Sequence, residues 1–150
     1  MSLVVALDAG PLGLVTNPKR SPESLACAQW LQALVAAGAR VVVPEIADYE
    51  VRRELMRGRR QQGLRRLDAI VELVEYLPLT TTAMRQAAAF WADARQRGQP
   101  TADDKALDGD VILAAQVATI GSTDGVVATT NVGHLSRYVP AALWRDIRNA

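Results

Sequence analysis

Short apolar runs alternate along the chain with longer segments whose apolar residues recur at helical spacing. Runs bounded by turn residues and rich in β-branched side chains predict strands at 3–8, 39–44, 76–79 and 125–131. Helical periodicity predicts helices over 21–38, 45–60, 64–77, 82–98 and 110–121, then a weak amphipathic helix or an edge element from Pro140 onward. Alternating strands and helices are typical of a parallel sheet covered on both faces. The pattern therefore predicts a single domain over 1–150 of the α/β class, a three-layer α/β/α sandwich with a central parallel sheet.

Composition limits the possible classes of protein. The chain has 150 residues, of which 49% are hydrophobic and 22% charged, as expected for one soluble globular domain. Apolar runs do not exceed six residues, whereas a membrane-spanning helix needs about 20. The first ten residues lack a basic segment and include Asp8, so they do not form a secretory signal and we expect a cytoplasmic protein. One cysteine, Cys27, and one histidine, His134, exclude a disulfide framework and a His–His metal site within one chain.

Charges cluster although the net charge is only +1. Between Arg52 and Arg66 lie seven arginines and a single acid, Glu54. A second cluster holds five of the sixteen acids, namely Asp103, Asp104, Asp108, Asp110 and Asp124. Acids near the start of helix 45–60 and arginines near its end suit the helix dipole, which is one interpretation of the basic cluster. The other is that the arginines bind nucleic-acid phosphates, because guanidinium groups match phosphate geometry. On that interpretation the RNA-binding residues are Arg52, Arg53, Arg57, Arg59 and Arg60.

Acids and one amide follow the predicted strands or begin the predicted helices. Asp8 ends the first strand, and Asn131 ends the fourth. Glu50 lies in helix 45–60, and Asp110 begins helix 110–121. Ligands of parallel sheets bind beyond the carboxyl ends of the strands, where helices also begin. We therefore expect these four side chains to form one pocket.

Crowded carboxylates either take up a proton or bind a cation. A few oxygen ligands suit Mg²⁺ or Mn²⁺, which keep several waters and bind phosphates. Such a metal can activate water for phosphodiester hydrolysis. Each residue also has a simpler interpretation: Asp8 as a turn residue before Gly10 and Pro11, Glu50 as a solvated helix residue, Asn131 as a turn residue. We expect one of Asp108 and Asp110 to cap the helix that follows and the other to face the pocket.

Four segments together resemble one known family. They are ALDAGPLGLV at the N-terminus, PEIADYEVRREL in the middle, LDGDVILAAQVA near residue 110 and VVATTNVGHL near residue 131. In order and spacing they resemble PIN domains, most closely the VapC-like bacterial proteins that consist of a single PIN domain. The resemblance extends over about the whole chain.

The resemblance implies a Mg²⁺- or Mn²⁺-dependent endoribonuclease that hydrolyses single-stranded RNA. Asp8, Glu50 and Asp110 match the family's first three metal-binding acids, and Asn131 stands where many members carry a fourth acid. The catalytic set implied is Asp8, Glu50, Asp110 and Asn131, and the metal ligands are Asp8, Glu50, Asp108 and Asp110. Asp108 is an alternative or a support to Asp110, as Glu45 and Glu54 are alternatives to Glu50.

Two functions of different classes remain open. The first is the ribonuclease, as the toxin of a toxin–antitoxin pair, with a small antitoxin as partner, a homodimeric state and no membrane association. The second is a nucleic-acid-binding module whose active site is weakened or inactive, which the neutral Asn131 favours. A phosphatase or phosphoacceptor domain ranks third, because the DAGPL segment lacks paired acids after the first strand.

Overall fold

The sheet has five parallel strands, in the order β3-β2-β1-β4-β5. The computed structural model describes residues 3–98, 108–121 and 125–148. The strands are β1 (Val4–Leu7), β2 (Arg40–Pro44), β3 (Glu75–Leu77), β4 (Gly125–Thr129) and β5 (Ala141–Leu143). All four pairings between them are parallel, so the predicted fold class is confirmed. All four residues of β1 are buried, because this strand is central and covered on both faces.

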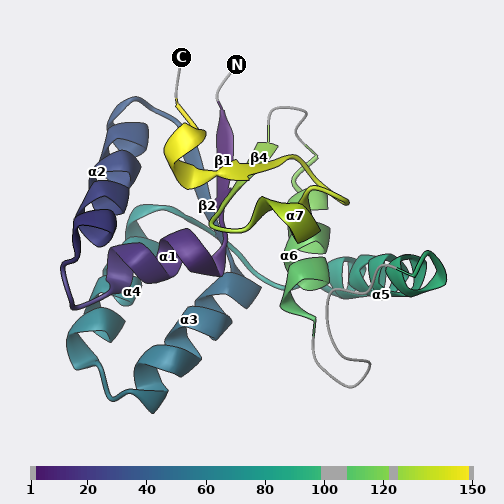
Figure 1. The fold of residues 1–150 in the computed structure, drawn as a ribbon, viewed down its shortest axis with the longest axis horizontal. Coiled ribbons are helices and arrows are strands. Elements are labelled where there is room, and N and C mark those ends of the chain that lie inside the picture. The colour runs from purple at the N-terminus through teal and green to yellow at the C-terminus, as the bar shows by residue number, and fades with distance from the viewer. Residues whose placement is uncertain (1–2, 99–107, 122–124, 149–150) are drawn as a thin grey trace.

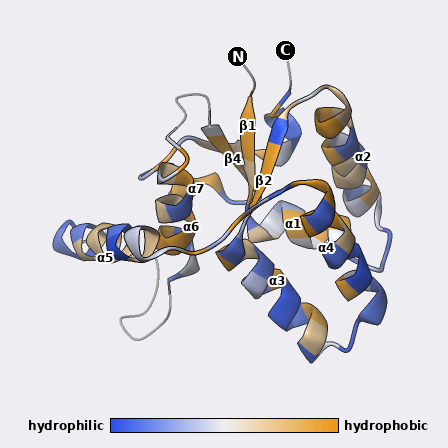
Figure 2. Ribbon diagram, turned by 180° about the vertical axis from the view of Figure 1, so that it is seen from behind, coloured by the Kyte–Doolittle hydropathy of each residue, from blue (hydrophilic) through white to orange (hydrophobic). Residues whose placement is uncertain are grey.

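Helices cover the two faces of the sheet and meet at its carboxyl edge. They are α1 (Ala9–Thr16), α2 (Pro22–Ala36), α3 (Glu45–Arg57), α4 (Gln61–Leu73), α5 (Thr81–Gln96), α6 (Gly109–Ala118) and α7 (Val132–Leu135), followed by the 3₁₀ turn η1 (Trp144–Asp146). Figure 1 shows α1, α2 and α4 on one side of the sheet and α5 and α6 on the other. Figure 2 shows α5 extending away from the body of the molecule. Among the described residues, no helix is long and apolar enough to span a bilayer.

Helix α6 is central to the core, because its residues Val111 to Val117 are all buried. Gln116 is one of them, and its side chain is fully buried. Its Oε1 accepts a hydrogen bond from the backbone of Ile46 at 3.1 Å, and its Nε2 donates one to the carbonyl of Leu77 at 2.8 Å. Gln116 therefore ties α6 to the first turn of α3 and to the end of β3.

Helix α1 is not predicted by the sequence pattern. Gly10 and Pro11 indicate a turn after the first strand, but both lie in the first turn of α1. Proline is tolerated there because the first N–H groups of a helix have no partner within it. A side chain at Gly10 would collide with the hydroxyl of Thr130, so this glycine lets α1 approach the end of β4.

Smaller differences concern the ends of elements. The helix predicted to reach Leu77 ends at Leu73, and β3 follows it. Helix α5 is capped by Thr80 and not by Thr82. The last segment contains the edge strand β5, and Trp144 after it is buried against Trp30, with ring centroids 5.6 Å apart.

Candidate active site

The site lies where the order of strands reverses. From β1 the chain runs outward to β2 and β3, then returns to place β4 on the other side of β1. The carboxyl ends of β1 and β4 therefore border a crevice in which parallel α/β sheets bind ligands. Leu7 pairs with Ala128, so Asp8 and Thr129 extend side by side into this crevice.

Hydrogen bonds to both its backbone and its side chain hold Asp8 in place. Its backbone N–H donates to the carbonyl of Ala128, and its Oδ1 accepts from the N–H of Ala9 at 2.7 Å. Thr129 Oγ1 donates to Asp8 Oδ2, also at 2.7 Å. Burial raises the pKa of Asp8, the bonds from Thr129 and Ala9 oppose that rise, and the nearby Asp110 charge adds to it. Asp8 is therefore a rigidly oriented acid, and its contact with Thr129 has no signal in the sequence pattern.

Glu50 is the acid of α3 that faces the crevice. A Cβ atom on Gly109 would lie 2.8 Å from Glu50 Oε1, so the carboxylate rests directly against the start of α6. Burial raises the pKa of Glu50, and so do the charges of Asp8, Asp110 and Asp108, whereas Arg53 lowers it. Acids from three separate segments therefore lie close enough for their charges to influence the pKa of Glu50.

The two alternatives to Glu50 are engaged elsewhere. Glu45 Oε1 accepts a hydrogen bond from the backbone of Leu79 at 2.7 Å and so joins α3 to the segment after β3. Glu54 is paired with Arg57 on the exposed face of α3. Glu50 is therefore the acid of this helix whose carboxylate interacts with the others.

Asp108 and Asp110 divide the two expected roles between them. Asp108 is buried and caps α6, because its Oδ1 accepts from the N–H groups of Asp110 and Val111 at 3.1 and 3.3 Å. Asp110, half-exposed, instead extends toward α7, where its Oδ2 lies 3.2 Å from His134 Nδ1. The expectation that one acid caps the helix is confirmed, and it is Asp108 that does so.

Asn131 caps the short helix α7. Its Oδ1 accepts from the N–H of Gly133 at 3.3 Å, and its own N–H donates to Thr129 Oγ1 at 3.0 Å. These contacts agree with its interpretation as a turn residue. His134, three residues after Asn131, is the residue of α7 that contacts a site acid, since its Nδ1 lies 3.2 Å from Asp110 Oδ2.

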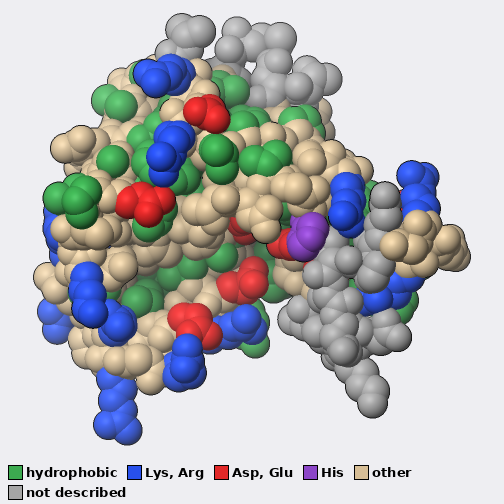
Figure 3. Space-filling view, in the orientation of Figure 1, with side chains coloured by type: hydrophobic (Ala, Val, Ile, Leu, Met, Phe, Trp, Pro, Cys, Tyr) green, Lys and Arg blue, Asp and Glu red, His purple; other side chains and the backbone are tan. Residues whose placement is uncertain are grey.

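Acidic side chains and the chain's one histidine gather around a recess on this face of the molecule (Figure 3). Among the described residues, no three Asp, Glu, His or Cys side chains are arranged to hold a metal ion directly. Asp103, Asp104 and Asp124 lie outside the described residues. The acids near one another are thus Asp8, Glu50 and Asp110, with the capping Asp108 behind them.

A groove of about 660 Å³ lies between α1 and α3, and Glu50 is the member of the acid group that lines it. Three of the five predicted RNA-binding arginines line it, namely Arg53, Arg57 and Arg60. Arg52 does not, because it forms ion pairs with Asp48 and Asp68 at 3.0 and 2.8 Å. Arg59 is also absent from the lining, whereas Lys19, which lies outside the basic cluster of the sequence, is part of it. The basic cluster therefore has a part that faces the groove and a part that stabilises α3 and α4.

Comparison of sequences finds no matching family model and no curated relative. Comparison of structures finds similar folds at low identity. A VapBC2 structure from Rickettsia felis, bound to a promoter DNA fragment, matches with a TM-score of 0.72 and 13% identity, covering 95% of this chain and 99% of the other. FitAcB from Neisseria gonorrhoeae gives a TM-score of 0.70 at 20% identity, with 95% and 99% coverage. DNA-bound VapBC from Salmonella typhimurium gives a TM-score of 0.64 at 20% sequence identity, covering 95% of this chain and 98% of the other. The chain therefore has a PIN-like α/β fold, shared over nearly its whole length with chains of VapBC and FitAcB structures, and the resemblance inferred from its sequence is confirmed at the level of the fold.

Proposed function

We propose that this chain is a Mg²⁺- or Mn²⁺-dependent endoribonuclease that hydrolyses phosphodiester bonds of single-stranded RNA. The observation that carries the proposal is the convergence of Asp8, Glu50 and Asp110, from three elements, at the strand-order reversal. Burial and mutual repulsion raise the pKa values of Asp8 and Glu50 there. Grouping these acids costs stability unless a cation offsets their charge.

The donor set fits a hydrated divalent cation better than a closed metal cage. Mg²⁺ dehydrates reluctantly and is commonly bound through one or two carboxylates, with waters and substrate phosphates as its other ligands. Asp8, Glu50 and Asp110 are the residues that would hold the ion. When bound, the ion supplies an activated water and offsets charge on the phosphate.

The chain's own residues orient the reacting groups. Thr129 and the N–H of Ala9 fix the two oxygens of Asp8, so that this carboxylate keeps one orientation. His134 contacts Asp110 from α7 and limits the rotation of its carboxylate. Arg53, on the rim next to Glu50, is placed to bind a phosphate of the substrate. Asp108 keeps the start of α6 in place beneath them.

A protein partner belongs to the same proposal. The similar folds occur in VapBC and FitAcB structures, two of the three described above with DNA. This likeness supports a role for the chain as the toxin of a toxin–antitoxin pair that forms a homodimer and binds a small antitoxin. Co-expression with the product of a short neighbouring reading frame, followed by co-purification, tests this part.

A metal titration on a mixed pool of single-stranded RNA tests the activity. We expect cleavage with Mn²⁺ or Mg²⁺, none in EDTA, and a loss of at least about 10²-fold in Asp8→Asn and Asp110→Asn, because each removes a charge from the metal site. The matched control is Asp68→Asn, whose carboxylate pairs with Arg52 and lies outside the acid group. Cleavage that continues in EDTA, or that both site variants retain, would contradict the proposal.

The second candidate is a nucleic-acid-binding module with an inactive site. The capping role of Asn131 favours it, since this residue contributes no charge and its amide oxygen is engaged within its own turn. RNA binding without cleavage under every metal condition would support this candidate.

A further inference from the structure

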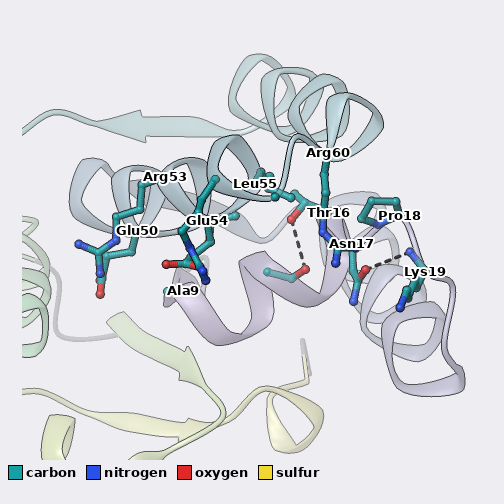
Figure 4. Close-up of a pocket in the computed structure, with 14 residues that line it drawn as sticks. Ala9, Thr16, Asn17, Pro18, Lys19, Glu50, Arg53, Glu54, Leu55 and Arg60 are labelled. Carbon is teal, nitrogen blue, oxygen red and sulfur yellow. Dashed lines mark hydrogen bonds and ion pairs between the residues drawn. The ribbon is translucent and has the colours of Figure 1, made fainter.

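The groove between α1 and α3 runs from Glu50, the member of the acid group in its lining, to a basic end of the molecule. Figure 4 shows Glu50 and Arg53 at one end of it and Lys19 at the other. Both walls are helices, and Ala9, Gly13 and Thr16 contribute the side formed by α1.

Charge along the groove favours a polyanion. Lys19, Arg53, Arg57 and Arg60 line it, against two acids, Glu50 and Glu54. Glu54 and Arg57 offset each other in an ion pair, which leaves Lys19, Arg53 and Arg60 against Glu50. The apolar lining residues Val51 and Leu55 are already buried, so they offer little surface to an apolar peptide. The groove is therefore acidic only at the site and basic along the rest of its length.

Gly13 keeps the floor of the groove open. A glycine inside a helix is unfavourable relative to alanine, so its presence needs a reason. Gly10 and Gly63 have a packing reason, since a Cβ atom would collide with Thr130 at the first and lie 2.6 Å from Leu55 at the second. A Cβ on Gly13 would meet nothing within 4 Å. The space above Gly13 is therefore not required by the fold itself.

We propose that this groove is the track along which the backbone of single-stranded RNA reaches the acids, with Gly13 as the residue that admits it and Lys19 and Arg60 as remote phosphate contacts. This inference rests on the proposed ribonuclease function and specifies where its substrate lies. The remote cations bind the strand away from the scissile bond, so they contribute to affinity and register without taking part in hydrolysis.

Four substitutions of Gly13 test the track, because its side chain would point into open space. Each is made in the Asp110→Asn background, so that a fluorescent RNA oligonucleotide of mixed sequence is bound without being cut. Gly13→Ala adds a single methyl group into open space, so it is the size control: it should fold as the parent does and weaken binding least of the four. Gly13→Gln should weaken binding by obstruction, Gly13→Glu should weaken it further by about tenfold, and Gly13→Lys should recover affinity relative to Gly13→Gln.

The remote cations are tested by salt dependence. The double variant Lys19→Ala, Arg60→Ala should lower the slope of log affinity against log salt by about 0.7 for each phosphate that the protein no longer neutralises. Arg59→Ala is the control, because Arg59 is a neighbouring exposed arginine outside the groove lining. Equal slopes in the double variant and in the control would overturn the assignment of Lys19 and Arg60.

Three outcomes separate the possibilities. Unchanged RNA affinity in all Gly13 variants would overturn the track. If Gly13→Gln, Gly13→Glu and Gly13→Lys weaken RNA binding equally, the groove does not select a polyanion. That result would point to another occupant, such as a segment of a protein partner, and would also overturn the track. If the unmodified chain cuts no RNA but the charge order at Gly13 holds in binding, the catalytic proposal fails while the track stands. Circular dichroism spectra confirm that each variant is folded.

Discussion

Thr129 is the residue that links the end of β4 to the first acid of the site. Its hydroxyl donates to Asp8 Oδ2 and also accepts from the N–H of Asn131, while its side chain is fully buried. One hydroxyl thus fixes two of the predicted site residues. A threonine at the end of a β-rich segment is ordinary, so no sequence pattern marks it; only the alignment of Leu7 with Ala128 brings it beside Asp8.

Thr129→Val should destabilise the fold and the metal site together. The change leaves a partly buried carboxylate oxygen without its donor, which typically costs about 1–3 kcal/mol. The hydrogen bond that it removes is one that lowers the pKa of Asp8, so that pKa should rise further and metal affinity should fall. Urea unfolding and Mn²⁺ titration measure the two effects. Thr129→Ser keeps the hydroxyl and should retain both properties; similar losses in Val and Ser would argue against this hydrogen bond as the cause.

Glu50→Gln should stabilise the metal-free protein at neutral pH while removing activity. The pKa of Glu50 is raised from 4.5 in the folded chain, so the folded state disfavours its charge. Well below pH 4.5 the carboxyl is protonated in both folded and unfolded states, and the variant gains nothing. As pH rises through the ordinary pKa to the raised one, the wild type loses stability relative to the variant, by about 0.5–1 kcal/mol for a partly exposed site.

Chemical denaturation of wild type and Glu50→Gln over a pH series in EDTA measures this difference. Glu54→Gln serves as the control, because the pKa of Glu54 is lowered by Arg57 and the sign reverses: that variant should lose stability, or gain none, as pH rises. A Glu50→Gln variant less stable than wild type at neutral pH would show that the acids do not repel one another in the folded chain.

At the scale of elements, the start of α6 shows why two neighbouring acids differ in role. Asp108 at the N-cap has extended backbone and accepts two N–H groups, whereas Asp110 lies in the first turn. The pattern of two acids before an apolar helix predicts that one of them caps it. Which of the two does so depends on where the helix begins, and sequence patterns locate a helix start only to within a few residues.

Asp108→Ala should lower the free energy of unfolding by about 1–2 kcal/mol, because α6 loses its N-cap in a buried position. Asp108→Asn and Asp108→Ser keep an acceptor oxygen and should restore most of that stability. If Asp108 instead binds the metal as directly as Asp110 does, Asp108→Asn will be stable but will not bind Mn²⁺. Thermal unfolding and Mn²⁺ titration of the three variants decide between the two roles.

Helix α3 shows how one element combines site and scaffold. Glu50 faces the acids and Arg53 faces the groove. Asp48 accepts from Arg52 and from the Tyr76 hydroxyl, at 2.7 Å in the latter case, and so joins α3 to β3. The basic cluster predicted from the sequence is thus divided by the direction in which each arginine leaves the helix.

At the scale of the whole molecule, strand order makes the site. β1 lies at the centre, and the return of the chain from β3 to β4 brings the segment after residue 125 next to the first strand. Glu50, 42 residues beyond Asp8, follows β2, and Asp110, 102 residues beyond it, precedes β4. Both acids come near Asp8 because β2 and β4 are the two neighbours of β1. The edge strand β5 pairs with β4, and Trp144 after it packs against Trp30 of α2.

Divalent metal should therefore stabilise the whole fold against unfolding. Ligand present at about 100 times its dissociation constant adds about 2.7 kcal/mol of stability when it binds only the folded state. Thermal scans with Mn²⁺, Mg²⁺ and EDTA measure the shift, with Asp8→Asn as the variant in which the shift should disappear. An equal shift in wild type and Asp8→Asn would locate the ion at some other site.

Local patterns of residues were enough to predict the fold class and most of the elements, because the apolar period and the N-cap residues are local signals. They also indicated the edge of the sheet at which Asp8, Glu50 and Asp110 meet, since each follows a strand or lies early in a helix. Three-dimensional contacts were needed to establish that Gly10 and Pro11 lie in the first turn of a helix, that Asp108 caps α6, and that Thr129 and His134 contact the acids. They also separated the arginines that face the groove from those that tie α3 to α4. These outcomes depend on register, helix rotation and contacts between segments far apart in the chain, and such long-range geometry has no counterpart in a local pattern of residues.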